Sequence, residues 1–167
     1  MKILFVIDYQ NDFVIGALST PGAELLDNNI AALVRKYGHG RVYYTIDFHG
    51  DQFAKSREGK HVPVHCKSGS WGCEIYGDTK NALAEVSAKA VSKSTFAPRK
   101  LTLPDEVDEI ELCGLLTDMC VLSSAVVFAT LFPDAKIKIN SSLCLGSDTQ
   151  AHKNALEIMR GLNMDIV

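Results

Sequence analysis

Short apolar runs alternate with segments of helical periodicity along the whole chain, and this alternation is the strongest constraint on its fold. Residues 3–7 and 42–46 are runs typical of strands that helices cover on both faces. Between them, residues 23–36 carry apolar side chains at helical spacing, and Gly38 and Gly40 are expected to end that helix. Repeated β-α alternation of this kind is typical of an α/β domain with a parallel sheet.

The same pattern continues to the C-terminus. Further strands are predicted over residues 88–91, 107–112, 135–139 and 164–167, and helices over 78–86, 120–131 and 147–160. Ser147 and Gln150 resemble a capping box that opens the last helix. A chain of 167 residues has the size of one domain and can bury a hydrophobic core. Because no linker or repeat divides it, residues 1–167 are expected to form a single domain.

Charge and cysteine content exclude several classes of protein. The net charge of -3 provides no basic surface, so nucleic acid is not an expected partner. No apolar segment approaches the roughly 20 residues that span a bilayer, and no signal-peptide cleavage site follows the first run, so no membrane partner is expected. The odd set of 5 cysteines has no CxxC pair, which argues against a disulfide framework and suits a reducing cytoplasm. A homo-oligomer is compatible with the sequence.

Three chemically distinct side chains follow predicted strands. Asp8 ends the first apolar run, Lys93 follows the strand at 88–91, and Cys120 follows a strand and turn. In an open parallel sheet, groups at the carboxyl ends of strands converge on one crevice. A carboxylate, an ammonium and a thiol gathered there can form and hold a thiolate nucleophile, so a catalytic site is predicted.

The local sequence around Cys120 supports two interpretations. Gly114 and the pair Thr117-Asp118 suggest a sharp turn and a helix N-cap, with Cys120 in the first helical turn, where the helix dipole lowers a thiol pKa. The alternative is that Cys120 is a small buried hydrophobic residue. That second interpretation is applied to the remaining cysteines, which are Cys66, Cys73, Cys113 and Cys144.

Residues 48–76 lack periodicity and contain three of the 5 histidines. A loop of this length in a compact domain is usually functional or disordered. Asp47 and His49 share one face of an extended segment, because side chains alternate along it. Together with His65 they would form a two-histidine, one-carboxylate set that suits Zn²⁺, Fe²⁺ or Mn²⁺. The alternative is a group of polar loop residues that share no ligand.

Residues 8–13, Lys93 and residues 114–121 together resemble the three motifs of isochorismatase-like cysteine hydrolases, in the same order and over nearly the whole chain. The resemblance implies a single-domain, three-layer α/β/α fold of the Rossmann-like type. It also implies a six-stranded parallel sheet with strand order 3-2-1-4-5-6.

The resemblance assigns specific roles to the motif residues. Asp8, Lys93 and Cys120 would be the catalytic triad, and the peptide between Leu115 and Leu116 would be cis. The backbone N–H groups of Leu116 and Cys120 would form the oxyanion hole.

The segment that contains Asp47, His49 and His65 resembles the corresponding loop of the nicotinamidase/pyrazinamidase branch of that family. This implies conversion of nicotinamide to nicotinate and ammonia through a Cys120 thioester, a step of NAD salvage. One divalent transition metal, zinc first and iron or manganese as alternatives, would be held by Asp47, His49, Glu58 and His65. His61 competes with Glu58 for the fourth place.

The substrate pocket departs from the pattern of the branch. Val62 stands where nicotinamidases usually carry Trp, Phe or Leu, and Val64 stands where they carry proline. Val62 would offer less wall to an aromatic ring, whereas Phe13 and Phe96 are candidate stacking partners. A hydrolase of another small amide or N-carbamoyl compound is therefore the nearest alternative. A binding module without chemistry is another, and a flavodoxin-like nucleotide binder is disfavoured because no Gly-rich loop follows the first strand.

Overall fold

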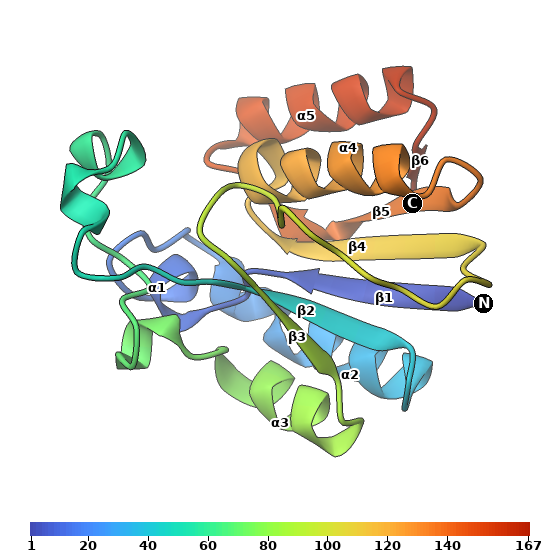
Figure 1. Ribbon diagram of the computed structural model, residues 1–167, viewed down its shortest axis with the longest axis horizontal. Coiled ribbons are helices and arrows are strands. Elements are labelled where there is room, and N and C mark those ends of the chain that lie inside the picture. Colours follow the sequence, from blue (N-terminus) through green and yellow to red (C-terminus); the bar gives the residue numbers. More distant parts are fainter.

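The computed structural model describes residues 1–167 and contains a six-stranded, wholly parallel sheet in the order β3-β2-β1-β4-β5-β6. The strands are β1 (Lys2–Ile7), β2 (Val42–Asp47), β3 (Lys89–Lys93), β4 (Glu109–Leu115), β5 (Lys136–Leu145) and β6 (Asp165–Ile166). The α-helices are α1 (Asn11–Val14), α2 (Asp27–Tyr37), α3 (Gly77–Glu85), α4 (Leu122–Leu131) and α5 (Thr149–Gly161). Figure 1 shows α2 and α3 on one face of the sheet and α4 and α5 on the other. The predicted three-layer fold and strand order are confirmed.

Strand β1 lies in the middle of the sheet, and residues 3–7 within it are fully buried. Helices cover both of its faces, which explains why its sequence is a continuous apolar run without alternation. The Phe5 ring shows how the layers join. Its centroid lies 5.2 Å from that of Tyr43 on β2 and 4.6 Å from that of Phe128 on α4.

The first long helix begins later than its periodicity predicted. Residues Ala23–Leu26 form a 3₁₀ helix, and the α-helix α2 starts at Asp27. The Asp27 carboxylate accepts hydrogen bonds from the backbone N–H groups of Asp78 and Thr79, at 2.7 and 2.9 Å, so it caps the start of α3. Helix α2 ends at Gly38, whose φ of 72° lies in the left-handed region that glycine tolerates, as predicted.

Strand β4 continues three residues beyond the predicted strand over 107–112 and includes Gly114. Gly114 has a φ of 117°, and a Cβ at this position would lie 2.2 Å from the carbonyl oxygen of Ile7 on β1. Gly114 suggested a turn in the sequence, but in the structure it allows the backbones of β4 and β1 to lie close together.

The predicted helix over residues 120–131 is two elements. Residues Thr117–Val121 form a π-helical turn, and the α-helix α4 runs from Leu122 to Leu131. No side chain caps this turn, so the predicted N-cap at Thr117-Asp118 is wrong. Both side chains instead bond to residues that follow β5, which a local pattern does not reveal.

The predicted capping box at the start of the last helix is also wrong. Helix α5 is capped by Asp148, whose carboxylate accepts a hydrogen bond of 2.7 Å from the Ala151 N–H. The Ser147 hydroxyl donates to Asp118, and the Gln150 amide donates to Asn154. The other predicted strands and helices are present with boundaries shifted by a few residues, the largest shift being the extension of β5 to Leu145.

The long segment between β2 and α3 is not featureless. It contains three short 3₁₀ helices, which are Phe53–Lys55, Glu58–Lys60 and Trp71–Cys73. Figure 1 shows this segment beyond the carboxyl ends of the central strands, at the same end of the sheet as α1. None of the helices has both the length and the apolar character needed to cross a membrane.

Candidate active site

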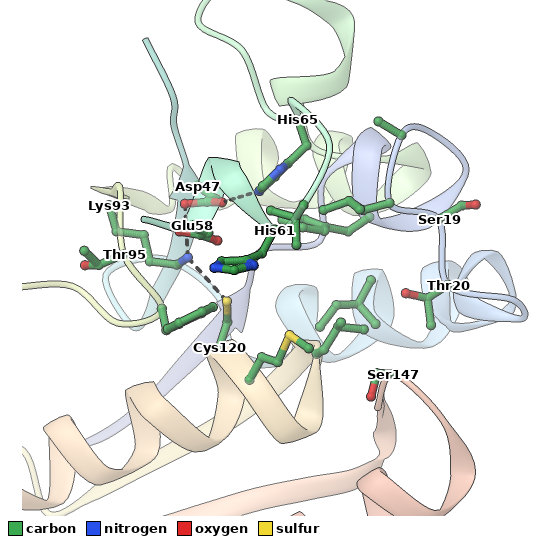
Figure 2. A pocket seen from close by; sticks show the side chains of 18 of the residues that line it. Ser19, Thr20, Asp47, Glu58, His61, His65, Lys93, Thr95, Cys120 and Ser147 are labelled. Carbon is green, nitrogen blue, oxygen red and sulfur yellow. Dashed lines mark hydrogen bonds and ion pairs between the residues drawn. The ribbon is translucent and has the colours of Figure 1, made fainter. Parts of the chain in front are cut away.

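The carboxyl ends of the four strands β1 to β4 open into a cavity of about 750 Å³. Asp8 directly follows β1, whereas Asp47 and Lys93 are the last residues of β2 and β3 and pair in register. Cys120 lies in the π-helical turn that follows β4. Figure 2 shows Asp47, Lys93 and Cys120 around one part of this cavity. The predicted convergence on one crevice is thus present.

The Lys93 ammonium is the centre of this group. Its Nζ lies 2.6 Å from Asp8 Oδ2, 3.4 Å from Asp47 Oδ1 and 3.6 Å from Cys120 Sγ. Neighbouring strands are about 4.8 Å apart, so β3 and β1 are separated by about 10 Å, and only a long side chain can reach from one to the other. The Lys93 side chain is 1% exposed, although lysine side chains mostly lie in solvent.

The Asp8 carboxylate is fully buried. Its Oδ1 accepts a hydrogen bond of 2.6 Å from the Thr45 hydroxyl on β2, which orients the carboxylate. Burial raises the pKa of Asp8, and the nearby Asp47 charge raises it further, whereas Lys93 opposes both effects. A carboxylate with a raised pKa holds a proton more readily, which suits a general base.

Burial raises the pKa of the Cys120 thiol well above its ordinary range. The Asp8 charge acts in the same direction, and the Lys93 charge opposes it. This direction is opposite to the one predicted from a helix N-terminus. Such a shift favours the neutral thiol, so formation of the thiolate calls for a base that accepts its proton. Burial likewise raises the pKa of the remaining cysteines, of which Cys66, Cys113 and Cys144 are buried as predicted and Cys73 is partly exposed.

The turn that carries Cys120 is fastened to the loop before α5 and to α5 itself. The Asp118 carboxylate accepts hydrogen bonds from the Ser147 N–H at 2.8 Å and from its hydroxyl at 2.6 Å. The Thr117 hydroxyl lies 2.8 Å from His152 Nδ1. π-Helical turns are often found at functional sites, and here the contacts hold the turn from a segment about 30 residues away.

Two features implied for the oxyanion hole can be located. The peptide between Leu115 and Leu116 is cis, as the resemblance implied. Leu116 and Cys120 both line the cavity.

Asp47, His49 and His65 are buried, and their potential ligand atoms all lie within 4.8 Å of one another. Asp47 Oδ2 is 2.9 Å from His49 Nε2 and 3.2 Å from His65 Nε2. Burial acts to raise the pKa of Asp47, but its contacts with His49 and His65 and the Lys93 charge hold it below its usual range. The three side chains therefore form one buried cluster that could hold a metal ion, as predicted.

The orientation of His65 fits a cation. Its Nδ1 lies 2.9 Å from the carbonyl oxygen of Pro63, which can only accept, so Nδ1 carries the hydrogen. In the neutral ring, Nε2 then presents a lone pair toward the Asp47 carboxylate. Two acceptors face each other, and either a proton or a metal ion between them removes the conflict. A backbone contact that fixes the tautomer in this way is typical of metal-binding histidines.

Glu58 and His61, the two candidates for a fourth metal ligand, both line the cavity. Neither belongs to the compact group of three, although the Glu58 charge acts to raise the pKa of His65. The three candidate substrate contacts, Phe13, Val62 and Phe96, also line the cavity.

Sequence reasoning missed residues that hold the site in place. The Gln10 side chain exchanges two hydrogen bonds with the Asp47 backbone, at 2.8 and 2.9 Å. Phe53 places its ring centroid 3.9 Å from that of His49 and 5.1 Å from that of His65. A signal for Gln10 was present, since it stands in the polar stretch directly after β1. Phe53 had none, because an aromatic residue in a long loop has no pattern to place it.

The Rossmann-like sheet brings a thiol, a carboxylate and a lysine together at its carboxyl edge, an arrangement that can support a thiol nucleophile. The family model for the isochorismatase domain matches residues 2–167. The chain therefore belongs to the isochorismatase family, and it is a hydrolase of the nicotinamidase-like type.

Known relatives agree with this assignment. The nicotinamidase/pyrazinamidase of Mycobacterium tuberculosis is 27% identical over 186 residues, covering 100% of this chain and 98% of that protein. The solved structure of a pyrazinamidase/nicotinamidase from Streptococcus mutans has a TM-score of 0.87 at 25% identity, with 100% of both chains covered. The structure of a Pyrococcus horikoshii pyrazinamidase in complex with zinc has a TM-score of 0.82 at 24% identity and covers 99% of this chain and 98% of that one.

Proposed function

We propose that this protein is a metal-containing amidase that hydrolyses nicotinamide to nicotinate and ammonia through a thioester on Cys120. One observation carries the proposal, namely the Lys93 ammonium lying 2.6 Å from Asp8 and 3.6 Å from Cys120 at the carboxyl edge of the sheet, where Lys93 and Cys120 line the cavity. The names of the related nicotinamidases support the choice of substrate.

The first half of the reaction forms the thioester. The Cys120 thiol passes its proton to Asp8, and the sulfur forms a bond to the carboxamide carbon. The N–H groups of Leu116 and Cys120 hold the resulting oxyanion, an effect of about 3 kcal/mol per donor in well-studied enzymes. The C–N bond then breaks, and Asp8 returns the proton to the leaving nitrogen, which departs as ammonia.

The second half releases the acid. Asp8 takes a proton from a water molecule as that water attacks the thioester carbonyl. The C–S bond breaks, the carboxylic acid forms, and the sulfur regains a proton. Burial acts to lower the pKa of Lys93, but the nearby charges of Asp8, Cys120 and Asp47 outweigh it and raise the pKa above its usual value. Lys93 therefore keeps its charge throughout the reaction. Its ammonium stabilises the thiolate and orients Asp8.

Asp47, His49 and His65 would hold one divalent ion, with zinc as the first candidate and iron or manganese as alternatives. When bound, such an ion would supply a Lewis acid that holds the pyridine nitrogen of the substrate, directly or through water, and so positions its amide. The mixed imidazole and carboxylate donors support this assignment. Glu58 is the candidate for a fourth group, since its charge already acts on His65.

The test is ammonia release from nicotinamide by the purified protein, before and after treatment with a chelator. Turnover is expected in the untreated enzyme and a large loss after chelation, reversed by added zinc. The variant Cys120→Ala should release no ammonia while it retains the metal. Near-normal turnover by Cys120→Ala would refute the thioester scheme, and inactivity of the wild-type enzyme on nicotinamide would refute the substrate.

A second candidate is hydrolysis of another small amide or of an N-carbamoyl compound. The small side chain of Val62 in the cavity lining favours it, because Val62 offers little surface to an aromatic ring. Turnover of such compounds by a protein that purifies without metal and ignores nicotinamide would establish this alternative.

A further inference from the structure

The cavity is much larger than the substrate proposed for it. Its volume is about 750 Å³. Cavities of roughly 300–1,000 Å³ enclose drug-sized ligands in known proteins, whereas a carboxamide on a single pyridine ring is far smaller than a drug. A nicotinamide bound between Cys120 and the metal ligands would therefore leave a large part of the cavity to solvent.

The remaining part has a different chemical character. We define the outer subsite as residues 17–21 together with Met119 and Ser147, all of which line the cavity. It contains apolar side chains and hydroxyl groups but no charged residue. Figure 2 shows Ser19, Thr20 and Ser147 across the cavity from Asp47 and Lys93. An uncharged ligand group is suited to such a surface, because it places no unpaired charge there.

Thr20 carries the strongest indication of a ligand. Its side chain lines the cavity, and the residue is only 7% exposed. The Ser147 hydroxyl is engaged by Asp118, but the Thr20 hydroxyl makes no hydrogen bond to another protein group. The fully buried side-chain atoms without a hydrogen-bond partner are Asp8 Oδ2 and Ser124 Oγ, so the Thr20 hydroxyl is open to the cavity and free to bond a ligand there.

We propose that the outer subsite binds an uncharged, hydrogen-bonding arm of the substrate, with the Thr20 hydroxyl as its partner. The substrate class is then an amide larger than a single-ring carboxamide, with the scissile bond at Cys120 and the arm beside residues 17–21. This inference rests on the proposed amidase function and narrows it to a substrate class.

The experiment compares nicotinamide with two series of larger amides. In one series a hydroxyethoxy arm is attached to the pyridine ring, and in the other a hydroxyethyl arm is attached to the amide nitrogen. Each is matched by an alkyl arm of equal length without the hydroxyl. Nicotinate or substituted nicotinate is quantified by chromatography. At least one hydroxyl-bearing compound should have a kcat/KM about 3- to 10-fold above its alkyl match, the range of one net hydrogen bond.

Two variants test the assignment to Thr20 and its neighbours. Thr20→Val removes the hydroxyl with little change in shape and should abolish the preference for the hydroxyl-bearing arm. Ala17→Phe should lower kcat/KM for the arm-bearing amides at least tenfold more than for nicotinamide, because the added ring fills the outer subsite. Thr102→Val is the control for the Thr20 change, since Thr102 is exposed and does not line the cavity.

Two results would overturn the proposal. In one, neither series shows a preference for the hydroxyl-bearing arm that Thr20→Val removes. In the other, Ala17→Phe lowers kcat/KM equally for nicotinamide and for the arm-bearing amides. Failure of the proposed function has a different signature, which is the absence of turnover with every amide. In that case calorimetry on Cys120→Ala still decides the inference. The hydroxyl-bearing arm should bind about 3- to 10-fold more tightly than its alkyl match, and adding Thr20→Val should remove the difference.

Discussion

The substitution Lys93→Met should expose how strongly the buried charges of the site depend on one another. Lys93 is the only cation in contact with the Asp8 carboxylate, at 2.6 Å, and both side chains are 1% exposed. Methionine keeps the unbranched apolar stem but removes the charge. Asp8 and Asp47 would then be buried near each other without the ammonium between them.

The magnitude follows from the burial. Removing one partner of a buried ion pair typically costs about 3–5 kcal/mol, because the other charge is left uncompensated. For a chain of this size each kcal/mol lowers Tm by roughly 2–4 °C, so Lys93→Met should unfold about 10 °C below the wild type. The double variant Asp8→Asn/Lys93→Met removes the stranded carboxylate and should recover a large part of the loss, a coupling of at least about 1 kcal/mol.

Urea unfolding followed by far-ultraviolet circular dichroism is the suitable assay, with all proteins brought to the same metal content. Fluorescence is a poor choice, because the single tryptophan, Trp71, is 56% exposed. Two outcomes would refute the reasoning. One is a Lys93→Met protein within 1 kcal/mol of wild type, and the other is a double variant no more stable than Lys93→Met.

The pH dependence of stability gives an independent check on the direction of the Asp8 pKa shift in Lys93→Met. In Lys93→Met the pKa of Asp8, already raised by burial, loses the opposing effect of Lys93 and rises further. The folded state then holds a proton that the unfolded state releases above about pH 4, so stability falls as pH rises through the folded-state pKa. The gap to wild type should narrow toward pH 4 and widen toward pH 7.

Three further substitutions test separate parts of the site. His65→Ala should lose the bound metal while the fold is kept, as measured by elemental analysis and circular dichroism, whereas the exposed His39→Ala should retain it; equal metal content in both would remove the metal assignment. Asp118→Ala should lower kcat about tenfold with KM changed less than twofold, because the two hydrogen bonds from Ser147 that position the Cys120 turn are lost; an unchanged kcat in steady-state assays would contradict this positioning role. Gly114→Ala should cost more than about 2 kcal/mol in urea unfolding, since its Cβ would lie 2.2 Å from the Ile7 carbonyl oxygen at a φ of 117°. Gly161→Ala, which meets nothing within 4 Å, is its control, and equal stability of the two variants would contradict the steric argument.

The sheet could be predicted from the sequence because its determinant is local. A strand that is covered on both faces must be apolar at every position, and residues 3–7 show this directly. Strand order came from the family resemblance. The convergence of Asp8, Lys93 and Cys120 followed from the topology of parallel sheets, which fixes where strand ends meet without knowledge of side-chain contacts.

Helix starts were predicted less well, because the partners that decide them are distant in sequence. Asp118 bonds to a residue 29 positions away, and Asp27 caps a helix that begins about 50 residues later. The pattern Ser147 to Gln150 satisfied a local rule, yet Asp148 is the cap and Ser147 bonds to Asp118. Each of these side chains has a choice of partners, and tertiary structure makes that choice.

The direction of the Cys120 pKa shift could not be predicted from the sequence either, because it depends on residues that are distant in sequence. A helix N-terminus lowers a thiol pKa, but burial raises it, and the extent of burial is a property of the folded chain. Asp8, which is 112 positions away in the sequence and close in space, adds to the rise. The sequence identified the thiol, whereas its protonation at rest depends on its neighbours.

Asp47 joins the two halves of the site, and this has a consequence for how they act together. One oxygen of its carboxylate faces Lys93, and the other faces both His49 and His65. A cation held at the second oxygen would draw negative charge away from Lys93, so the ammonium would interact more strongly with Asp8 and with the Cys120 thiolate as it forms. Under the proposed function, metal binding and nucleophile activation would be coupled through a single buried side chain. The coupling would be direct because Lys93 pairs with Asp47 in the strand register and its long stem crosses toward β1.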